Sequence, residues 1–68
     1  MPVITITMGK GQAGPDQKEA LIKSITDTAV TCTGIPARSF TILINELPGD
    51  NIGIAGDTLT KIRAAQEQ

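Results

Sequence analysis

The stretch FTILINEL, residues 40–47, decides how this chain folds. Its first five residues are all apolar or β-branched, which indicates a strand that is covered on both faces. Glu46 and the turn-forming segment PGDN, residues 48–51, end the strand. A strand of this kind suits a parallel sheet, so we expect a helix and a partner strand before it in the chain.

The segment that precedes this strand predicts one long helix, from about Pro15 to Thr33. Proline suits the first helical position and Gly14 is an acceptable cap, whereas Gly34 and then Pro36 suit the residues beyond the helix. Residues spaced by 3.6 positions give this helix an apolar face. The face consists of Leu21, Ile22, Ile25, Ala29 and Cys32, and Lys18 is expected to point elsewhere.

The segment VITITM, residues 3–8, predicts a first strand whose side chains alternate between two faces. The order strand, helix, strand predicts an α/β fold, namely a β-α-β unit with parallel strands and a right-handed crossover. After the second strand, residues 52–57 suit a small hairpin or loop, and residues 58–68 suit a short helical turn. In the first strand, Ile4, Ile6 and Met8 share one face, and Val3, Thr5 and Thr7 share the other.

The small size of the chain predicts self-association. With 68 residues it is expected to be a single domain, residues 1–68, of marginal stability on its own. The chain has one cysteine, Cys32, so it cannot form an internal disulfide. It has no histidine, so one thiol with scattered carboxylates does not make a structural zinc site. Because two strands do not make a stable sheet, we expect dimerisation to complete a four-stranded sheet under two helices. Further copies would cover the other face of that sheet.

The composition argues against two classes of partner. The net charge is −1, from six basic and seven acidic residues, and Phe40 is the only aromatic residue. Nucleic-acid binding therefore lacks both the positive charge and the stacking surface that it needs. No apolar run is long enough to span a membrane, and no signal-peptide pattern opens the chain. The sequence predicts a soluble, cytoplasmic protein with no nucleic-acid or membrane partner.

Pro2 is the residue whose position points to unusual chemistry. With no histidine and no paired carboxylates, ordinary acid–base constellations are nearly absent. If Met1 is removed, Pro2 carries a free secondary amine, whose pKa starts from about 7.7–8.0. Apolar burial or a nearby cation lowers this pKa, which makes the amine a general base near neutral pH. Proline also suits the first position of a strand, and the residues alone leave both interpretations open.

Four other residues have a structural interpretation first. Cys32 is expected to be a small core residue, because no histidine is available to activate it. Glu46 is expected to be a solvated residue beside a turn. Arg38 and Arg63 are expected at the surface, where either could bring positive charge to a site at a subunit interface.

Several segments together resemble the 4-oxalocrotonate tautomerase family over nearly the whole chain, about residues 2–62. They are the penultimate Pro2, PDQKEALIKSITD after the first loop, IPARSFTILINEL after the helix, and NIGIAGD near the end. Their order and spacing are more specific than any one of them. The resemblance implies a β-α-β subunit in a homo-oligomer, usually a hexamer built as a trimer of dimers, and an enzyme without a cofactor or metal.

The resemblance also implies a mechanism. After removal of Met1, the amino-terminal proline moves a proton between oxygen and carbon of a 2-hydroxydienoate such as 2-hydroxymuconate, which converts an enol into a conjugated keto acid. Arginines bind the carboxylates of this small-molecule substrate and polarise its carbonyl group. An aromatic residue of the hairpin lines the pocket.

Position by position, the match to this family is partial. Pro2 matches the catalytic proline. Gln12 stands where typical members have an arginine of the first loop, and Thr41 where they have an arginine of the second strand. Ile52 stands in place of the hairpin phenylalanine. Gln12 and Thr41 can hydrogen-bond a carboxylate, but they lack the charge-assisted bidentate contact of arginine.

Two explanations of these substitutions stay open. Either Arg38, Arg63 or Lys10 takes over anion binding, from the same or a neighbouring subunit, or the pocket accepts a less charged or different substrate. The leading hypothesis is a proline-dependent tautomerase of a divergent branch. The alternatives are a proline-dependent hydratase or dehalogenase of unsaturated acids, and a non-catalytic oligomeric protein that keeps the fold.

Overall fold

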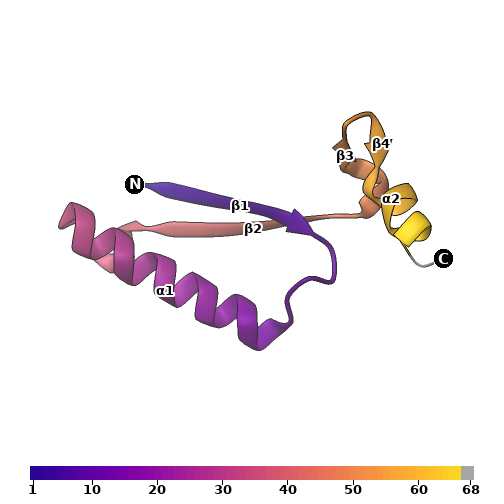
Figure 1. The fold of residues 1–68 in the computed structure, drawn as a ribbon. Coiled ribbons are helices and arrows are strands. Elements are labelled where there is room, and N and C mark those ends of the chain that lie inside the picture. The colour runs from indigo at the N-terminus through magenta and orange to yellow at the C-terminus, as the bar shows by residue number, and fades with distance from the viewer. Residues whose placement is uncertain (67–68) are drawn as a thin grey trace.

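A computed structural model describes residues 1–66 as a strand, a long helix and a second strand, followed by a small hairpin and a second helix (Figure 1). β1 is Val3–Gly9, α1 is Pro15–Thr33 and β2 is Thr41–Leu47. β1 and β2 pair in parallel along their whole length. The β-α-β fold predicted from the sequence is therefore confirmed.

α1 begins and ends where local sequence signals place its bounds. The backbone N–H of Gly14 donates to Oε1 of Gln17 at 2.8 Å, ahead of Pro15 at the first helical position. Gly34 has a φ of 75°, and its N–H donates to the carbonyl of Val30 at 2.8 Å. Glycine suits this left-handed conformation because it has no Cβ to clash with the following carbonyl. The predicted bounds of the helix are confirmed.

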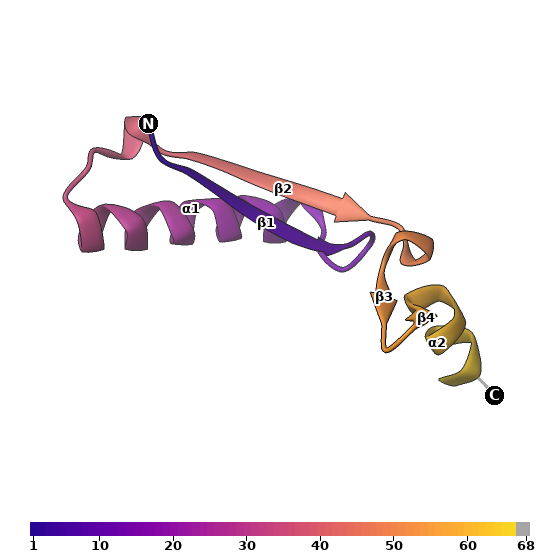
Figure 2. The ribbon, with the colours of Figure 1, turned by 90° about the horizontal axis from the view of Figure 1, so that it is seen from above.

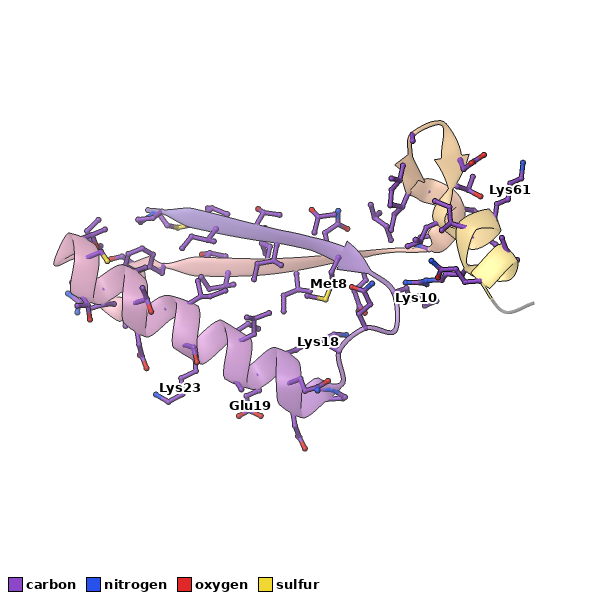
Figure 3. All side chains as sticks on the ribbon, in the orientation of Figure 1. Met8, Lys10, Lys18, Glu19, Lys23 and Lys61 are labelled. Carbon is purple, nitrogen blue, oxygen red and sulfur yellow. The ribbon has the colours of Figure 1, made fainter. Side chains whose placement is uncertain are left out.

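The strand pair has one face against α1 and one open face (Figures 1 and 2). Met8 points from β1 toward α1 (Figure 3), and it is half-buried, as are Ile4 and Ile6. On the open face Val3 is 51% exposed and Leu43 of β2 is 50% exposed. The alternation predicted for β1 is confirmed, but a single chain does not cover β2 on both faces.

The buried stripe of α1 differs from the predicted apolar face. Leu21, Ile25 and Ala29 are half-buried as expected, whereas Ile22 and Cys32 are exposed. A two-stranded sheet covers only part of a helix, and it leaves Ile22 and Cys32 accessible in this chain by itself. The prediction that Cys32 is a core residue is wrong for this chain by itself. Lys18 was expected to point elsewhere, yet it lies on the half-buried stripe.

Beyond β2 the chain forms a compact hairpin and helix. The turn Gly49–Asn51 leads to β3 (Gly53–Ile54), β4 (Asp57–Thr58) and α2 (Leu59–Gln66). The expected hairpin is confirmed, and α2 is longer than the single turn predicted for residues 58–68, of which 67 and 68 lie outside the described residues. Neither helix within residues 1–66 is long and apolar enough to cross a membrane.

The chain is elongated rather than compact. Its extents are 48 × 24 × 15 Å and its radius of gyration is 15.7 Å, whereas a compact domain of this length has a radius of about 11 Å. Among residues 1–66 no apolar side chain is fully buried. One chain therefore builds the framework of a fold without an apolar core of its own.

Candidate active site

Six of the candidate residues that the sequence singles out lie at opposite ends of the strand pair. Because β1 and β2 are parallel, their amino-terminal ends meet at one edge and their carboxyl-terminal ends at the other. Seven residues separate the two ends, which corresponds to about 23 Å. Pro2, Arg38 and Thr41 lie at the amino-terminal end, and Gln12, Ile52 and Arg63 lie at the carboxyl-terminal end.

Pro2 is held at the start of the strand pair. Its carbonyl accepts a hydrogen bond of 3.0 Å from the backbone N–H of Thr41, and its side chain is half-buried. Met1, directly before it, is 90% exposed. The hydrogen bond uses the carbonyl of Pro2 and leaves its nitrogen out of the ladder. This geometry therefore suits both a strand-starting proline and a free amine in a fixed position.

Arg38 lies near this end because of the turn that leads into β2. It belongs to the short 3₁₀ turn Ala37–Ser39, in which the N–H of Ser39 donates to the carbonyl of Pro36 at 3.0 Å. Its side chain is exposed, and no carboxylate among residues 1–66 forms an ion pair with it. Arg38 and Thr41 therefore lie at the same end of the strand pair as Pro2. Arg38 is cationic and Thr41 is neutral.

Gln12 and Arg63 come together over Gly9, which is the one buried residue among residues 1–66. A Cβ placed on Gly9 would lie 3.0 Å from Nε2 of Gln12 and 3.7 Å from Nη2 of Arg63. Two hydrogen-bond donors from separate elements, the loop after β1 and α2, therefore lie over the last residue of β1. The sequence indicated both residues as candidates, but no sequence signal indicated that they lie side by side.

Ile52 holds the base of the hairpin. It is half-buried, and its carbonyl accepts a hydrogen bond of 2.8 Å from the N–H of Leu59, the first residue of α2. Ile54, further along the hairpin, is 54% exposed. The backbone of Ile52 thus fixes α2 against the hairpin. Ile54 is an exposed apolar residue of the hairpin, and the sequence did not indicate it as a candidate.

Glu46 forms an ion pair that the sequence did not predict. Its Oε1 lies 2.6 Å from Nζ of Lys18, and both residues are half-buried. Lys18 extends from the start of α1 (Figure 3). The hydrogen bond from Lys18 lowers the pKa of Glu46, as do the Gly11 backbone and the charge of Lys10, against the opposing effect of desolvation. The expectation of a merely solvated residue is wrong. The ion pair with Lys18 favours the ionised carboxylate and joins the end of β2 to the start of α1.

The site formed by these residues is divided within one chain. Residues 1–66 enclose no pocket. A potential base lies at one end of the strand pair, and the Gln12–Arg63 donors lie at the other. Chemistry that needs both groups requires the ends of two chains to meet.

Fold and site together define a small β-α-β protein with a proline before its first strand. The sequence model of the family described as "Tautomerase enzyme" matches residues 2–62. The chain belongs to this tautomerase family, and its family places it among isomerase-type enzymes. A 2-hydroxymuconate tautomerase of Pseudomonas putida is 38% identical over 56 residues, which cover 82% of this chain and 87% of the relative. Identities of this size are consistent with a divergent member.

Solved structures share the fold. A 4-oxalocrotonate tautomerase isozyme from Methylibium petroleiphilum is 30% identical with a TM-score of 0.89, over 94% of this chain and 98% of the other. A structure described for trans-3-chloroacrylic acid dehalogenase activity is 29% identical with a TM-score of 0.75, over 85% of this chain and 98% of the other. The same fold therefore occurs in relatives with two different activities.

Proposed function

We propose that this protein is a tautomerase that converts enol or dienol acids, such as 2-hydroxymuconate, into keto acids. The general base is the amine of Pro2 after removal of Met1. The main structural support is the position of Pro2. It is half-buried, its carbonyl accepts a hydrogen bond of 3.0 Å from the N–H of Thr41, and it directly follows an exposed Met1. The similarity to a 2-hydroxymuconate tautomerase supports this substrate class.

The proposed reaction needs one base that both accepts and returns a proton. The nitrogen of Pro2 takes the proton of the 2-hydroxyl group, and the electrons of the O–H bond form the carbonyl. The carbon–carbon double bond shifts, and a carbon of the conjugated chain takes the proton back from the proline nitrogen. The ring of proline keeps this nitrogen in one orientation throughout, which suits a base that serves two atoms of one substrate.

The proposed site is completed by a second copy of the chain. About 23 Å of strand separates Pro2 from the Gln12–Arg63 pair within one chain, so both reach one substrate only across an interface. The exposed apolar side chains of Val3 and Leu43 on the open sheet face, and of Ile22 on α1, support such packing. We propose a homo-oligomer, with a hexamer built as a trimer of dimers as the expected form, acting in the cytoplasm without a cofactor.

A second candidate function is the addition of water to, or the loss of halide from, unsaturated acids by the same amine. The observation that favours it is the similarity to the structure described for dehalogenase activity. A non-catalytic oligomer is the third candidate, favoured by Gln12 and Thr41 in place of arginines.

One assay separates these candidates. Ketonisation of 2-hydroxymuconate and of a monoacid enol is followed for wild type and Pro2→Ala, with release of chloride from 3-chloroacrylate measured beside it. We expect wild type to ketonise at least one enol, and Pro2→Ala to lose about a hundredfold or more in kcat/KM. Thr5→Ser, on the open face of the same strand, is the matched control. Unchanged activity in Pro2→Ala would remove Pro2 from the mechanism, and inactivity of wild type toward every substrate would favour the non-catalytic oligomer.

A further inference from the structure

We infer that Arg63, together with Gln12, binds the substrate carboxylate remote from the reacting carbon. The inference rests on the proposed tautomerase function and assigns a specificity-determining residue to its site. Arg63 lies just beyond residues 2–62, which the family model matches.

The first support is the convergence of donors over Gly9. The nitrogen atoms Nε2 of Gln12 and Nη2 of Arg63 both lie within 4 Å of the point where a Gly9 side chain would begin. The absence of a side chain at Gly9 leaves room for both groups there. A guanidinium beside an amide N–H group presents several donors to one anion, and guanidinium geometry matches that of a carboxylate. The pair therefore has the chemistry that binds a carboxylate.

The second support is the local balance of charge. Lys10 lies at this same end of the strand pair, beside α2 (Figure 3). The nearby carboxylate of Glu46 is held by Lys18 at 2.6 Å, and no acidic side chain within residues 1–66 forms an ion pair with Arg63. The positive charge of Arg63 is therefore not neutralised by these residues, and an anionic ligand can use it.

The third support is that α2 holds Arg63 in place. The N–H of Leu59, the first residue of α2, donates a hydrogen bond to the carbonyl of Ile52, and the N–H of Lys61 donates to Oγ1 of Thr58 at 3.1 Å. A Cβ on Gly49 would lie 2.6 Å from Oγ1 of Thr60, so the helix packs closely on the preceding turn. Arg63 thus extends from a fixed helix, whereas Arg38 lies at the opposite end of the strand pair. These contacts favour Arg63 over Arg38 as the residue that replaces the missing loop arginine.

The test compares binding of two unreactive acids of equal chain length. Muconate is a dicarboxylate without an enol, and sorbate is the corresponding monocarboxylate. Titration calorimetry on the assembled protein gives the ratio of their dissociation constants. We expect Arg63→Ala to weaken muconate about tenfold or more and leave sorbate nearly unchanged, because one charge-assisted contact is lost.

Two further variants control for charge and for shape. Lys61→Ala removes a positive charge from the same helix, on a side chain that points away from the strand pair (Figure 3), and is expected to leave the ratio unchanged. Gly9→Ala keeps every charge but places a methyl group 3.0 Å from Nε2 of Gln12 and is expected to weaken muconate selectively. The crowded atoms are the ends of flexible side chains, so this variant should fold.

The inference is overturned if Arg63→Ala leaves the muconate-to-sorbate ratio of dissociation constants at the wild-type value, or if Lys61→Ala raises this ratio equally. Its failure is distinguishable from failure of the proposed function. Full activity of Pro2→Ala would contradict proline catalysis and would say nothing about ligand binding. An unchanged ratio of dissociation constants in Arg63→Ala would contradict only the role of Arg63.

Discussion

At the scale of single residues, the chain has the penultimate proline of the family that it resembles. It has Gln12 and Thr41 at the positions where typical members have arginines. A cation beside an amine disfavours its protonated form and so lowers its pKa. In the proposed site, neutral residues at these two positions remove two charges that would lower the pKa of a Pro2 amine, and Arg63 beside Gln12 restores only one of them. We therefore expect lower activity at neutral pH and a more basic optimum than in relatives with both arginines.

Gln12→Arg is expected to reverse part of this effect. The added guanidinium lowers the pKa of the Pro2 amine in the proposed shared site, so the acidic limb of the kcat/KM profile moves to lower pH. It also binds a carboxylate, which should raise kcat/KM for 2-hydroxymuconate about tenfold. The measurement is a pH–rate profile of both proteins, with Gln12→Met as an uncharged control. An acidic limb that stays in place or moves to higher pH would contradict the argument.

At the scale of elements, the Lys18–Glu46 pair joins the start of α1 to the end of β2. It also lies beside the loop that carries Gln12, because the backbone of Gly11 contributes to the lowered pKa of Glu46. The pair thus links three segments that must be placed correctly for the Gln12–Arg63 donors to meet.

This pair predicts a specific dependence of stability on pH. The pKa of Glu46 in the fold lies below its ordinary value of 4.5. The ionised form is therefore stabilised by folding, and its contribution is fully present above about pH 4.5 and lost as the pH falls through the lowered value. We expect Glu46→Gln to be less stable than wild type at pH 7, and the difference to shrink as the pH falls below 4.5.

Thermal unfolding across this pH range checks the prediction. Asp27→Asn is the matched control, because it removes an exposed ion pair, with 3.4 Å between Nζ of Lys23 and Oδ2 of Asp27, that contributes little to stability. A difference between Glu46→Gln and wild type that stays the same from pH 7 to pH 3 would show that the ion pair is not its cause.

The sequence predicts elements whose signals are local and misses contacts between distant segments. The bounds of α1 follow from Gly14, Pro15 and Gly34, which act on adjacent backbone, and both strands follow from their apolar and β-branched residues. The Lys18–Glu46 pair joins residues 28 positions apart, and no periodic pattern indicates it. Likewise, the candidate site residues can be named from the sequence, but the meeting of Gln12 and Arg63 depends on how α2 packs.

At the scale of the whole molecule, the elongated shape and the divided site have the same consequence. The radius of gyration is 15.7 Å, one sheet face is open, and residues 1–66 of one chain have no apolar core. The same division leaves Pro2 and the Gln12–Arg63 pair at opposite ends of the strands. Association of copies would supply the core and complete the site together, so stability and catalysis are expected to depend on the same interfaces.

Native mass spectrometry of the naturally produced protein tests this account most directly, because it measures the assembly and the mass of each chain at once. The account predicts an oligomer, expected to be a hexamer, in which every chain lacks Met1 and begins at Pro2. Chains that retain Met1 would contradict catalysis by the proline amine, and a protein that remains a single folded chain would contradict the shared site.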